Sequence, residues 1–354
     1  MKIAILTRTG FHHASFINRL QEEFEIACVV RESYPEQKKD NPSKSFLKKI
    51  GIGLTQDEIF LNGFYEKYSA GFRHHSGLKE YLKAPFDVVI EKKSTKYLGI
   101  NCGDINSPDI EVFLKDIAPD IIVVLGSSII KLNILTIPKI AMMNIHTGLS
   151  PYYRGTWSYG WPIVNKEPEY IGVTLHHVNS GIDSGDIIYQ TRPMLNVHDD
   201  LNTIFLKVVS EGIELAVMAV KEILKNGSIR SYKQPVSKEF ISKAPSPCGE
   251  DNAPAFGTPS LPKRGKGELI SPPLRGGPAC PVGRDEGEGD VCGFTNDLSS
   301  NTGRLYLAKD FNAEIARRCL SNLEEGILET YIQKKDQFDS RVKLSGFIPP
   351  QITK

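Results

Sequence analysis

Apolar runs and helical patterns alternate along the N-terminal part of the chain. Residues 2–7 form a short run rich in isoleucine and leucine, and the Thr9-Gly10 pair after it indicates a turn. In residues 14–24 the apolar side chains recur at helical spacing, and residues 25–30 are apolar again. This order of strand, turn, helix and strand predicts the start of a doubly wound α/β sheet.

The same alternation continues further along the chain. Residues 87–91 and 121–125 are short apolar runs typical of buried parallel strands. Residues 104–115 are expected to form a helix, because Pro108 suits a first turn and the apolar residues after it share one face. The polar, lysine-rich residues 31–85 are expected to add helical insertions over the sheet.

Three further strands and a long helix are predicted in the middle of the chain. The strands are expected at residues 141–145, 170–178 and 187–195. Asp199 or Asp200 can cap the helix, which would end at Asn226-Gly227. The whole pattern predicts an α/β fold with a doubly wound, mostly parallel, Rossmann-like sheet.

The composition changes sharply from residue 245 onward. Nine prolines and ten glycines fall between Pro245 and Gly293. Such a segment cannot bury enough apolar surface to offset the entropy lost on ordering, so we interpret residues 245–302 as a disordered low-complexity insertion. Residues 231–244 and 303–354 would form a small C-terminal α+β extension, with one helix that includes Ile315 and Tyr331.

Charge and cysteine content limit the classes of partner and site. The formal net charge is +1, which gives no electrostatic reason to expect a nucleic-acid partner. The six cysteines are scattered without a C-x-x-C pair, so neither a zinc site nor a disulfide framework is expected. No stretch approaches the roughly 20 apolar residues of a membrane span, and no signal-peptide pattern is present. A soluble cytoplasmic protein without a membrane partner is the expectation.

The stretch from Asn144 to Asp186 brings together an amide, an imidazole and a carboxylate. Asn144 and His146 are two residues apart, so an extended backbone would point both side chains the same way. Asp183 lies in the turn S-G-I-D-S-G, whose glycines let the backbone approach a ligand closely. The amide can stabilise an oxyanion and the other two groups can move protons, which suits acyl transfer to an amine.

This stretch resembles the folate-dependent formyltransferases, which include the glycinamide ribonucleotide, methionyl-tRNA and nucleotide-sugar N-formyltransferases. The shared pattern is N-x-H, then P-x-x-R-G, and further on V-T-x-H and D-x-G. It is carried by Asn144, His146, Pro151, Arg154, Gly155, Gly172-Val173-Thr174, His176, Asp183 and Gly185. Thr147, Gly148 and Ser150 depart from the H-P-S-L-L-P that the family often has here, which bears on the acceptor more than on the chemistry.

The resemblance implies that residues 1–230 form a formyltransferase catalytic domain, with Asn144, His146 and Asp183 as catalytic residues. Asp186, three residues on, is the rival carboxylate. N10-formyltetrahydrofolate would be the formyl donor, and no metal would be required. The residues implied to bind the donor are Leu125, Gly126, Ser127, Ile130, Gly181 and Ile182. Those implied to contact the acceptor are Gly10, His12, Tyr153, Arg154 and Trp157.

Several of these residues also have a purely structural interpretation. Residues 125–130 could be only the exit of a strand, and Arg154 could form an ion pair that holds its loop. The aromatic loop around Trp157 could be a satellite core. His12 could be an exposed loop histidine, and His176 a strand histidine with satisfied hydrogen bonds.

The acceptor favoured by the sequence is a small molecule, the primary amine of a nucleotide-linked amino sugar. The aromatic-rich loop can stack on a base or a sugar ring, and the C-terminal residues do not show the five alternating strands of a β-barrel. Three alternatives stay open: a methionyl-tRNA acceptor, hydrolysis of the formyl donor by the same three residues, and an inactive binding module. A homodimer is also considered.

The first testable prediction concerns the low-complexity segment. Deleting residues 246–300 should leave folding intact, because loop closure costs grow slowly with length and this segment offers little to a core. Thermal unfolding of the full-length and shortened chains measures the effect. Loss of the cooperative transition in the shortened chain would show that the segment packs into the fold.

Overall fold

The computed structural model describes residues 1–33, 55–70, 88–234 and 304–348. These residues all belong to one compact unit, formed by Met1–Ser242 together with Asn301–Lys354. Residues 243–300 are not part of this unit and lie outside the described residues. The interpretation of residues 245–302 as a disordered insertion therefore concerns residues outside the described part of the chain, as does most of the prediction for residues 31–85.

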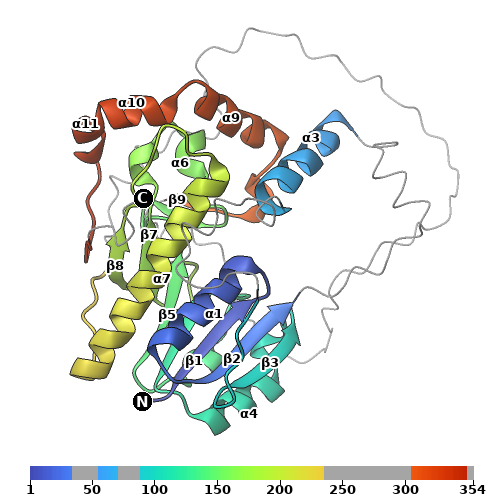
Figure 1. Ribbon diagram of the computed structural model, residues 1–354, viewed down its shortest axis with the longest axis vertical. Coiled ribbons are helices and arrows are strands. Elements are labelled where there is room, and N and C mark those ends of the chain that lie inside the picture. Colours follow the sequence, from blue (N-terminus) through green and yellow to red (C-terminus); the bar gives the residue numbers. More distant parts are fainter. Residues whose placement is uncertain (34–54, 71–87, 235–303, 349–354) are drawn as a thin grey trace, which may run out of the picture. The chain divides into compact units, whose positions relative to one another are not determined.

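A seven-stranded sheet with the order β3-β2-β1-β4-β5-β7-β8 forms the centre of this unit (Figure 1). The pairs among β1 to β5 are parallel, whereas β5–β7 and β7–β8 are antiparallel. The predicted α/β class with a mostly parallel sheet is confirmed. The strands are β1 (Ile3–Arg8), β2 (Ile26–Ser33), β3 (Lys96–Asn101), β4 (Ile121–Leu125), β5 (Ala141–His146), β7 (Val173–His177) and β8 (Ile187–Thr191).

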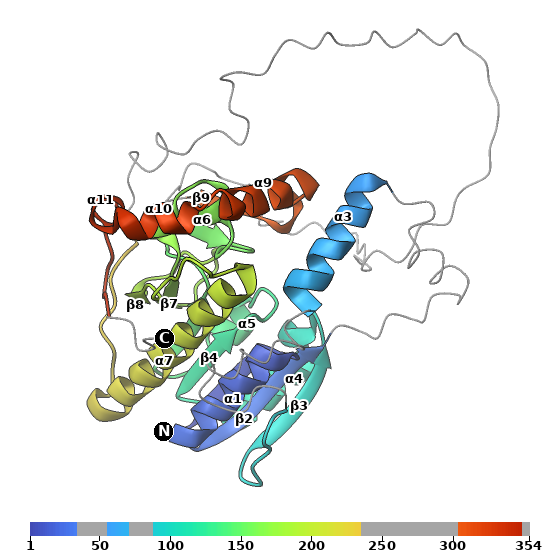
Figure 2. The ribbon, with the colours of Figure 1, turned by 45° about the horizontal axis from the view of Figure 1, so that its top comes forward.

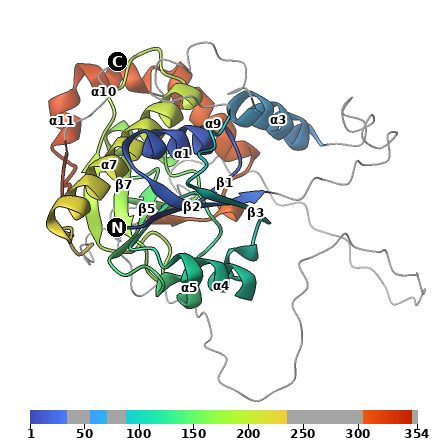
Figure 3. The same ribbon diagram turned by 60° about the horizontal axis from the view of Figure 1, so that its bottom comes forward.

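Helices cover both faces of the sheet, as in a doubly wound fold (Figure 3). On one face lie α1 (Phe11–Glu23) and α7 (Leu201–Asn226), and on the other lie α4 (Pro108–Ile117) and α5 (Leu132–Leu135). Strand β1 shows why two cores form, because successive side chains of a strand point to opposite faces. Ile3 and Ile5 join the larger core, whereas Ala4 and Leu6 join the smaller one.

Helix α7 has the ends that the sequence predicts. The Asp200 carboxylate accepts a hydrogen bond from the Thr203 N–H at 2.9 Å, and the Asp200 N–H donates to the Thr203 hydroxyl at 2.8 Å. Gly227 ends the helix in the left-handed conformation. At Gly212 a Cβ would lie 2.5 Å from the Ile145 side chain, so a glycine is needed where the helix crosses β5.

The predicted strand at residues 87–91 is wrong in the described part. Residues 88–91 form no strand, and the strand of this region is β3, at Lys96–Asn101. The cause is side-chain competition for the backbone: Asn18 of α1 bonds both the Val88 carbonyl and the Ile90 N–H, at 2.8 Å each. The apolar side chains of Val88 and Ile90 remain exposed.

The single C-terminal helix predicted across Ile315 and Tyr331 is instead two helices. They are α9 (Ala313–Glu324) and α10 (Ile327–Gln333), with α11 (Lys335–Asp339) after them. Gly326 separates the first two because its φ of 78° is not helical. Helix α9 is fastened to α6 (Trp161–Val164), since the Asn322 amide donates to the Ile163 carbonyl at 2.8 Å (Figure 2).

The C-terminal residues also supply a strand. Strand β9 (Arg304–Tyr306) pairs in parallel with β6 (Tyr153–Gly155) in a separate two-stranded sheet. Short helical segments complete the described residues: α3 (Gln56–Tyr65), the π-helix Glu66–Ala70, and the 3-10 turns Asp104–Asn106, Pro168–Tyr170 and Ala308–Asp310. Residues 304–348 thus pack within the same unit as the sheet.

The second prediction tests the cap of α7. The Asp200→Ala variant should lower the free energy of unfolding by about 0.5–2 kcal/mol, because the Thr203 N–H loses its acceptor. Denaturant unfolding of the variant and the wild type gives this difference. An unchanged midpoint would mean that packing of the helix, rather than its cap, determines its stability.

Candidate functional site

Strand β5 and the turn after β7 bring the predicted catalytic residues together. Asn144 lies beside Val124 of β4 and His176 of β7, and His146 follows on the same face of the strand. Asp183 lies in the turn that joins β7 to β8 and has a φ of 47°, in the left-handed region. The site is therefore at the carboxyl ends of β4 and β5, the edge where open α/β sheets bind ligands.

Each ring nitrogen of His146 has a polar neighbour. Its Nε2 lies 2.8 Å from the Tyr153 carbonyl oxygen, which can only accept, so we assign the ring proton to Nε2. Its Nδ1 lies 3.3 Å from the Asp183 Oδ2. Burial lowers the pKa of His146, and this outweighs the Asp183 carboxylate and the Tyr153 carbonyl, which raise it. At neutral pH the ring is therefore uncharged, with a free electron pair on Nδ1.

Asp183 is the group on which the other polar side chains converge. Its carboxylate lies beside His146 and accepts from the Gly155 N–H at 2.9 Å and from the Asn144 amide at 3.5 Å. Burial acts to raise the pKa of Asp183, but His146, His176 and the Gly155 N–H together bring it well below its usual range. The carboxylate is thus ionised at neutral pH, beside the free electron pair of His146.

The rival carboxylate, Asp186, points elsewhere. It forms an ion pair with Lys233 at 2.9 Å. The structure places Asp183, not Asp186, against His146. The assignment of the carboxylate role to Asp183 stays a prediction about function, but its geometric premise holds.

His176 orients the amide of Asn144. Its Nδ1 lies 2.8 Å from the His177 carbonyl, so Nδ1 carries the proton and Nε2 can accept. The Asn144 Nδ2 donates to that Nε2 at 3.2 Å. This fixes the amide so that its nitrogen faces His176 and Asp183. Both ring nitrogens of His176 thus have hydrogen-bond partners, in agreement with its structural interpretation, and one of these partners is Asn144 of the site.

Arg154 is buried beside the site without an ion pair among the described residues. Its side chain is 7% exposed, and its Nε has no hydrogen-bond partner in this part of the chain. Burial lowers the pKa of Arg154, and the Asp183 carboxylate opposes that shift. The predicted ion pair that would hold the loop is therefore not found here. A buried guanidinium with an unused donor suits an anionic ligand group.

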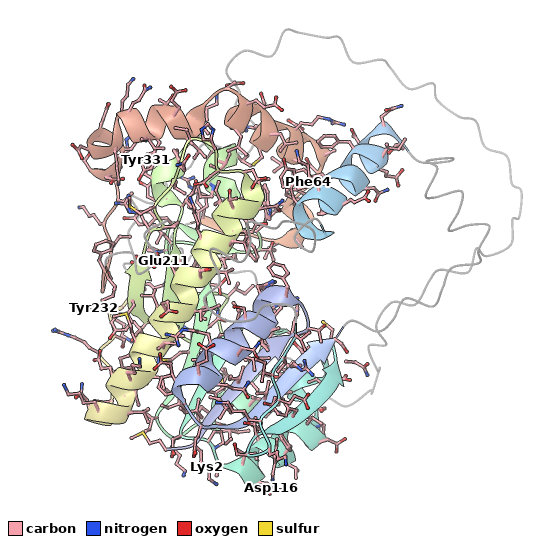
Figure 4. The ribbon with its side chains drawn as sticks, viewed as in Figure 1. Lys2, Phe64, Asp116, Glu211, Tyr232 and Tyr331 are labelled. Carbon is pink, nitrogen blue, oxygen red and sulfur yellow. The ribbon has the colours of Figure 1, made fainter. Side chains whose placement is uncertain are left out.

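Tyr153 and Trp157 are placed differently from their predicted role at the acceptor. Tyr153 is fully buried, and its hydroxyl contacts Glu167 and Arg304, so its ring offers no surface for a ligand. Trp157 packs against Phe311, with ring centroids 4.5 Å apart, and near Phe64. Figure 4 shows Phe64 where α3 meets the C-terminal segment. The aromatic loop thus forms mainly a small secondary hydrophobic core. Tyr153 contacts the site only through its backbone carbonyl, which accepts a hydrogen bond from His146.

The loop predicted to bind the formyl donor, residues 125–130, contains both buried and exposed residues. Leu125 and Ile130 are buried in the two cores, so only their backbone can meet a ligand, whereas Gly126 and Ile129 are exposed. Ser127 is half-buried.

Sequence reasoning missed the residue that fixes this loop. The Glu32 carboxylate, 1% exposed, accepts from the Ser128 N–H at 2.5 Å and from the Gly103 N–H at 2.9 Å. Glu32 lies in β2, just beyond the strand predicted at residues 25–30, and 96 positions before Ser128. Nothing local in the sequence signals the contact.

The remaining predicted ligand contacts lie in two turns. Gly181 and Ile182 are exposed in the turn that carries Asp183. Gly10 precedes α1, and the buried Nδ1 of His12 has no hydrogen-bond partner among the described residues. The His12 ring packs edge-on against Phe205 at 5.1 Å, so His12 is not simply an exposed loop histidine.

Within the described residues there is no group of three or more His, Cys, Asp or Glu side chains that could hold a metal ion. The described helices also include none that is long and apolar enough to cross a membrane.

Comparison with known proteins agrees with this geometry. Residues 76–220 match the family model "Formyl transferase". The methionyl-tRNA formyltransferase of Caldanaerobacter subterraneus subsp. tengcongensis is 33% identical over 130 residues, covering 36% of this chain and 41% of that protein. That of Clostridioides difficile is 36% identical over 110 residues, 29% of this chain and 35% of that protein. The chain thus matches less than half the length of these relatives.

Among the solved structures to which this chain is similar is a 4-N formyltransferase from Francisella tularensis. It is 20% identical and covers 67% of this chain and 74% of its own, with a TM-score of 0.40. Another is a formyltransferase of Anoxybacillus kamchatkensis in complex with UDP-4,6-dideoxy-4-formamido-L-AltNAc and tetrahydrofolate. It is 20% identical and covers 67% of this chain and 83% of its own, with a TM-score of 0.34.

The fold and the site define an α/β protein with an amide, an imidazole and a carboxylate converging at a sheet edge. Residues 76–220, which contain Asn144, His146 and Asp183, match the formyl transferase family model. This match and the similar methionyl-tRNA formyltransferases support membership of the folate-dependent formyltransferase family.

The third prediction concerns acid stability. Burial lowers the pKa of His12 to about 4 and that of His13 well below its usual value, and it also lowers the pKa of His146. Below about pH 6.5 the unfolded chain therefore binds protons that the folded chain does not. Stability should be greatest above pH 6.5 and should fall towards pH 4, by roughly 1.4 kcal/mol per pH unit for each such proton.

Chemical denaturation between pH 7.5 and pH 4 measures this slope. In a His12→Phe variant the slope should be shallower, because one of the titrating groups is gone and an aromatic ring still fills the space beside Phe205. Equal slopes in the two proteins would show that His12 titrates normally in the folded chain.

Proposed function

We propose that this protein is an N-formyltransferase that moves a formyl group from N10-formyltetrahydrofolate to a primary amine. The observation that carries the proposal is the contact of Asp183 with both His146 and Asn144, at 3.3 and 3.5 Å. These are the groups that the resemblance assigns to catalysis. The same residues lie inside the matched segment 76–220.

In the proposed reaction His146 is the base, through Nδ1. The Tyr153 carbonyl occupies Nε2, which leaves Nδ1 as the nitrogen with a free electron pair. As the acceptor amine attacks the formyl carbon it becomes acidic, and Nδ1 takes its proton. The imidazolium that forms is then paired with Asp183, whose negative charge is already in place. The proton leaves with the tetrahydrofolate nitrogen when the tetrahedral intermediate collapses.

Asn144 supplies the donor for the oxygen that becomes negative in that intermediate. Its Nδ2 already bonds His176 at 3.2 Å, and its second, longer contact is to Asp183 at 3.5 Å. We infer that the longer contact is the one exchanged for the developing oxyanion, because a long hydrogen bond is the weaker of the two. The amide thus needs no large rearrangement.

The folate donor would lie against the loop at residues 125–130 and the turn at Gly181-Ile182. When bound, it supplies the formyl group and the leaving amine. The loop fits such a group because Glu32 holds its backbone while Gly126 and the apolar Ile129 face outward. A fixed backbone edge beside an exposed apolar side chain suits a flat heterocycle that needs both hydrogen bonds and contact area.

For the acceptor we propose the amine of a nucleotide-linked amino sugar, a small molecule. The observation in favour is the buried guanidinium of Arg154, whose Nε has no hydrogen-bond partner among the described residues and which suits a phosphate group near the site. The matched methionyl-tRNA formyltransferases make methionyl-tRNA the second candidate. Hydrolysis of the donor is the third, since water could replace the amine. A cytoplasmic location and a homodimer remain predictions.

The fourth prediction tests the chemistry. Replacing His146 by Ala should slow formyl transfer by at least ~10²-fold, as loss of a positioned base typically does. Asn144→Ala should cost ~10²–10³-fold, as lost oxyanion donors do. Donor affinity should change little in both variants, because the folate would lie against the backbone of a different loop. The measurement is single-turnover transfer from N10-formyltetrahydrofolate, with donor binding measured separately.

His198→Ala is the matched control, since His198 is exposed and lies outside the site. The acceptor panel should contain nucleotide amino sugars, methionyl-tRNA and water alone. Transfer at the wild-type rate in both site variants would refute the mechanism. Donor breakdown that depends on His146 but not on any amine would favour the hydrolase instead.

A further inference from the structure

Strand β6 is a link between the C-terminal segment and the proposed catalytic residues. One edge of β6 faces β9, where the Arg304 N–H donates to the Tyr152 carbonyl at 3.2 Å and the Thr156 N–H donates to the Tyr306 carbonyl at 2.8 Å. The alternate backbone groups face the site. They are the Tyr153 carbonyl, which accepts from His146, and the Gly155 N–H, which donates to Asp183.

We propose, on the basis of the function proposed above, that β9 and its residue Arg304 position His146 and Asp183 for proton transfer. The ring orientation of His146 depends on the Tyr153 carbonyl, and the carboxylate of Asp183 depends on the Gly155 N–H. Both backbone groups belong to a three-residue strand whose only partner strand in the described chain is β9. Arg304 is therefore a positioning residue, not a catalytic one.

Gly155 shows how closely the two strands approach. Its φ is 89°, and a Cβ at this position would lie 1.9 Å from the Tyr306 carbonyl oxygen. Only glycine permits both this conformation and this contact. The glycine of the P-x-x-R-G pattern thus has a physical role here, which is to let β9 bind β6 at the residue whose N–H holds Asp183.

Side chains lock the same pair of strands. The Arg304 guanidinium binds the Glu167 carboxylate in a fork, at 2.6 and 2.9 Å, and also donates to the Tyr153 hydroxyl at 2.6 Å. The Asn165 amide bridges the hydroxyls of Tyr153 and Tyr306, at 3.0 and 2.9 Å. A bidentate arginine–carboxylate pair is specific in direction, so this network sets the position of β6 and not merely its stability.

Gln234, which precedes the low-complexity segment in the sequence, binds the turn that carries Asp183. The Gln234 amide donates to the carbonyls of Asp183 and Gly185, at 2.8 Å each. Gln234 is the last described residue before that segment, and Arg304 is the first described residue after it. Gln234 binds the turn that carries Asp183, and Arg304 binds Tyr153 of β6, the strand that contacts Asp183 through Gly155. The site is thus supported by residues on both sides of it.

The fifth prediction is a test of Arg304 in the full-length protein. In Arg304→Ala, kcat for formyl transfer should fall by about 10²-fold, the cost of an ångström-scale misplacement of a reacting group. The KM for the donor should not change, since the donor loop is anchored by Glu32 and not by β9. Arg304→Lys keeps the charge but not the fork and should recover part of the rate. Arg317→Ala, an exposed arginine of the same segment, is the matched control.

A second measurement does not depend on turnover. Nitrogen NMR of the His146 ring, assigned with a His146→Gln variant, should show the Nε2–H tautomer in the wild type. In Arg304→Ala the tautomers should mix, and the pKa of His146 should fall further, because the Tyr153 carbonyl that raises it is released. If Arg304→Ala does not fold, the rate of formyl transfer and the His146 NMR signal are measured in Glu167→Gln and Arg304→Lys instead.

The outcomes separate the two proposals. Loss of rate together with a changed His146 signal supports the positioning role. An unchanged rate in a folded Arg304→Ala variant overturns it, and so does a lower rate with an unaltered His146 signal. A wild-type protein that transfers no formyl group to any acceptor refutes the proposed function, while the NMR comparison still decides whether β9 positions the histidine.

Discussion

The negative charge of Asp183 can persist in its largely enclosed setting only because donors surround it. Taking a carboxylate out of water is costly, and the cost is offset where N–H groups and a chargeable ring are already in place. Here the donors are the Gly155 N–H and the Asn144 amide, and the chargeable rings of His146 and His176 lie beside the carboxylate at 3.3 and 3.5 Å. These groups come from β5, β6 and β7. Two strands of the central sheet and the strand that pairs with β9 thus meet at one carboxylate.

This arrangement also explains how His146 can be neutral and still be a useful base. Burial disfavours its charged form, whereas Asp183 favours it, so the two effects oppose each other. A base that is neutral before the reaction and stabilised once protonated has the properties that proton transfer at neutral pH requires. The Tyr153 carbonyl adds direction, because it decides which nitrogen carries the first proton. Position and protonation are therefore controlled by the same backbone group.

Local signals in the sequence predict the parts of this structure that are themselves local. The apolar runs of β1 and β4, a cap of α7 at Asp199 or Asp200 and the end of α7 at Asn226-Gly227 can all be predicted from the sequence, because each depends on neighbouring residues. The two-residue spacing of Asn144 and His146 was enough to predict a shared face. The strand expected at 87–91 was wrong, because Asn18, some 70 positions away, binds that backbone.

The supports of the site could not be predicted for the same reason. Glu32 with Ser128, Gln234 with Asp183, and Arg304 with Glu167 are contacts between residues far apart in the chain. The partners in these contacts are mostly backbone groups or residue types common at protein surfaces, which form no recognisable sequence motif. The family match ends at residue 220, yet hydrogen bonds to the site continue to Gln234 and, through β6, to Arg304–Tyr306. The unit that orders the proposed site is therefore larger than the segment that the family shares, and it is discontinuous in sequence.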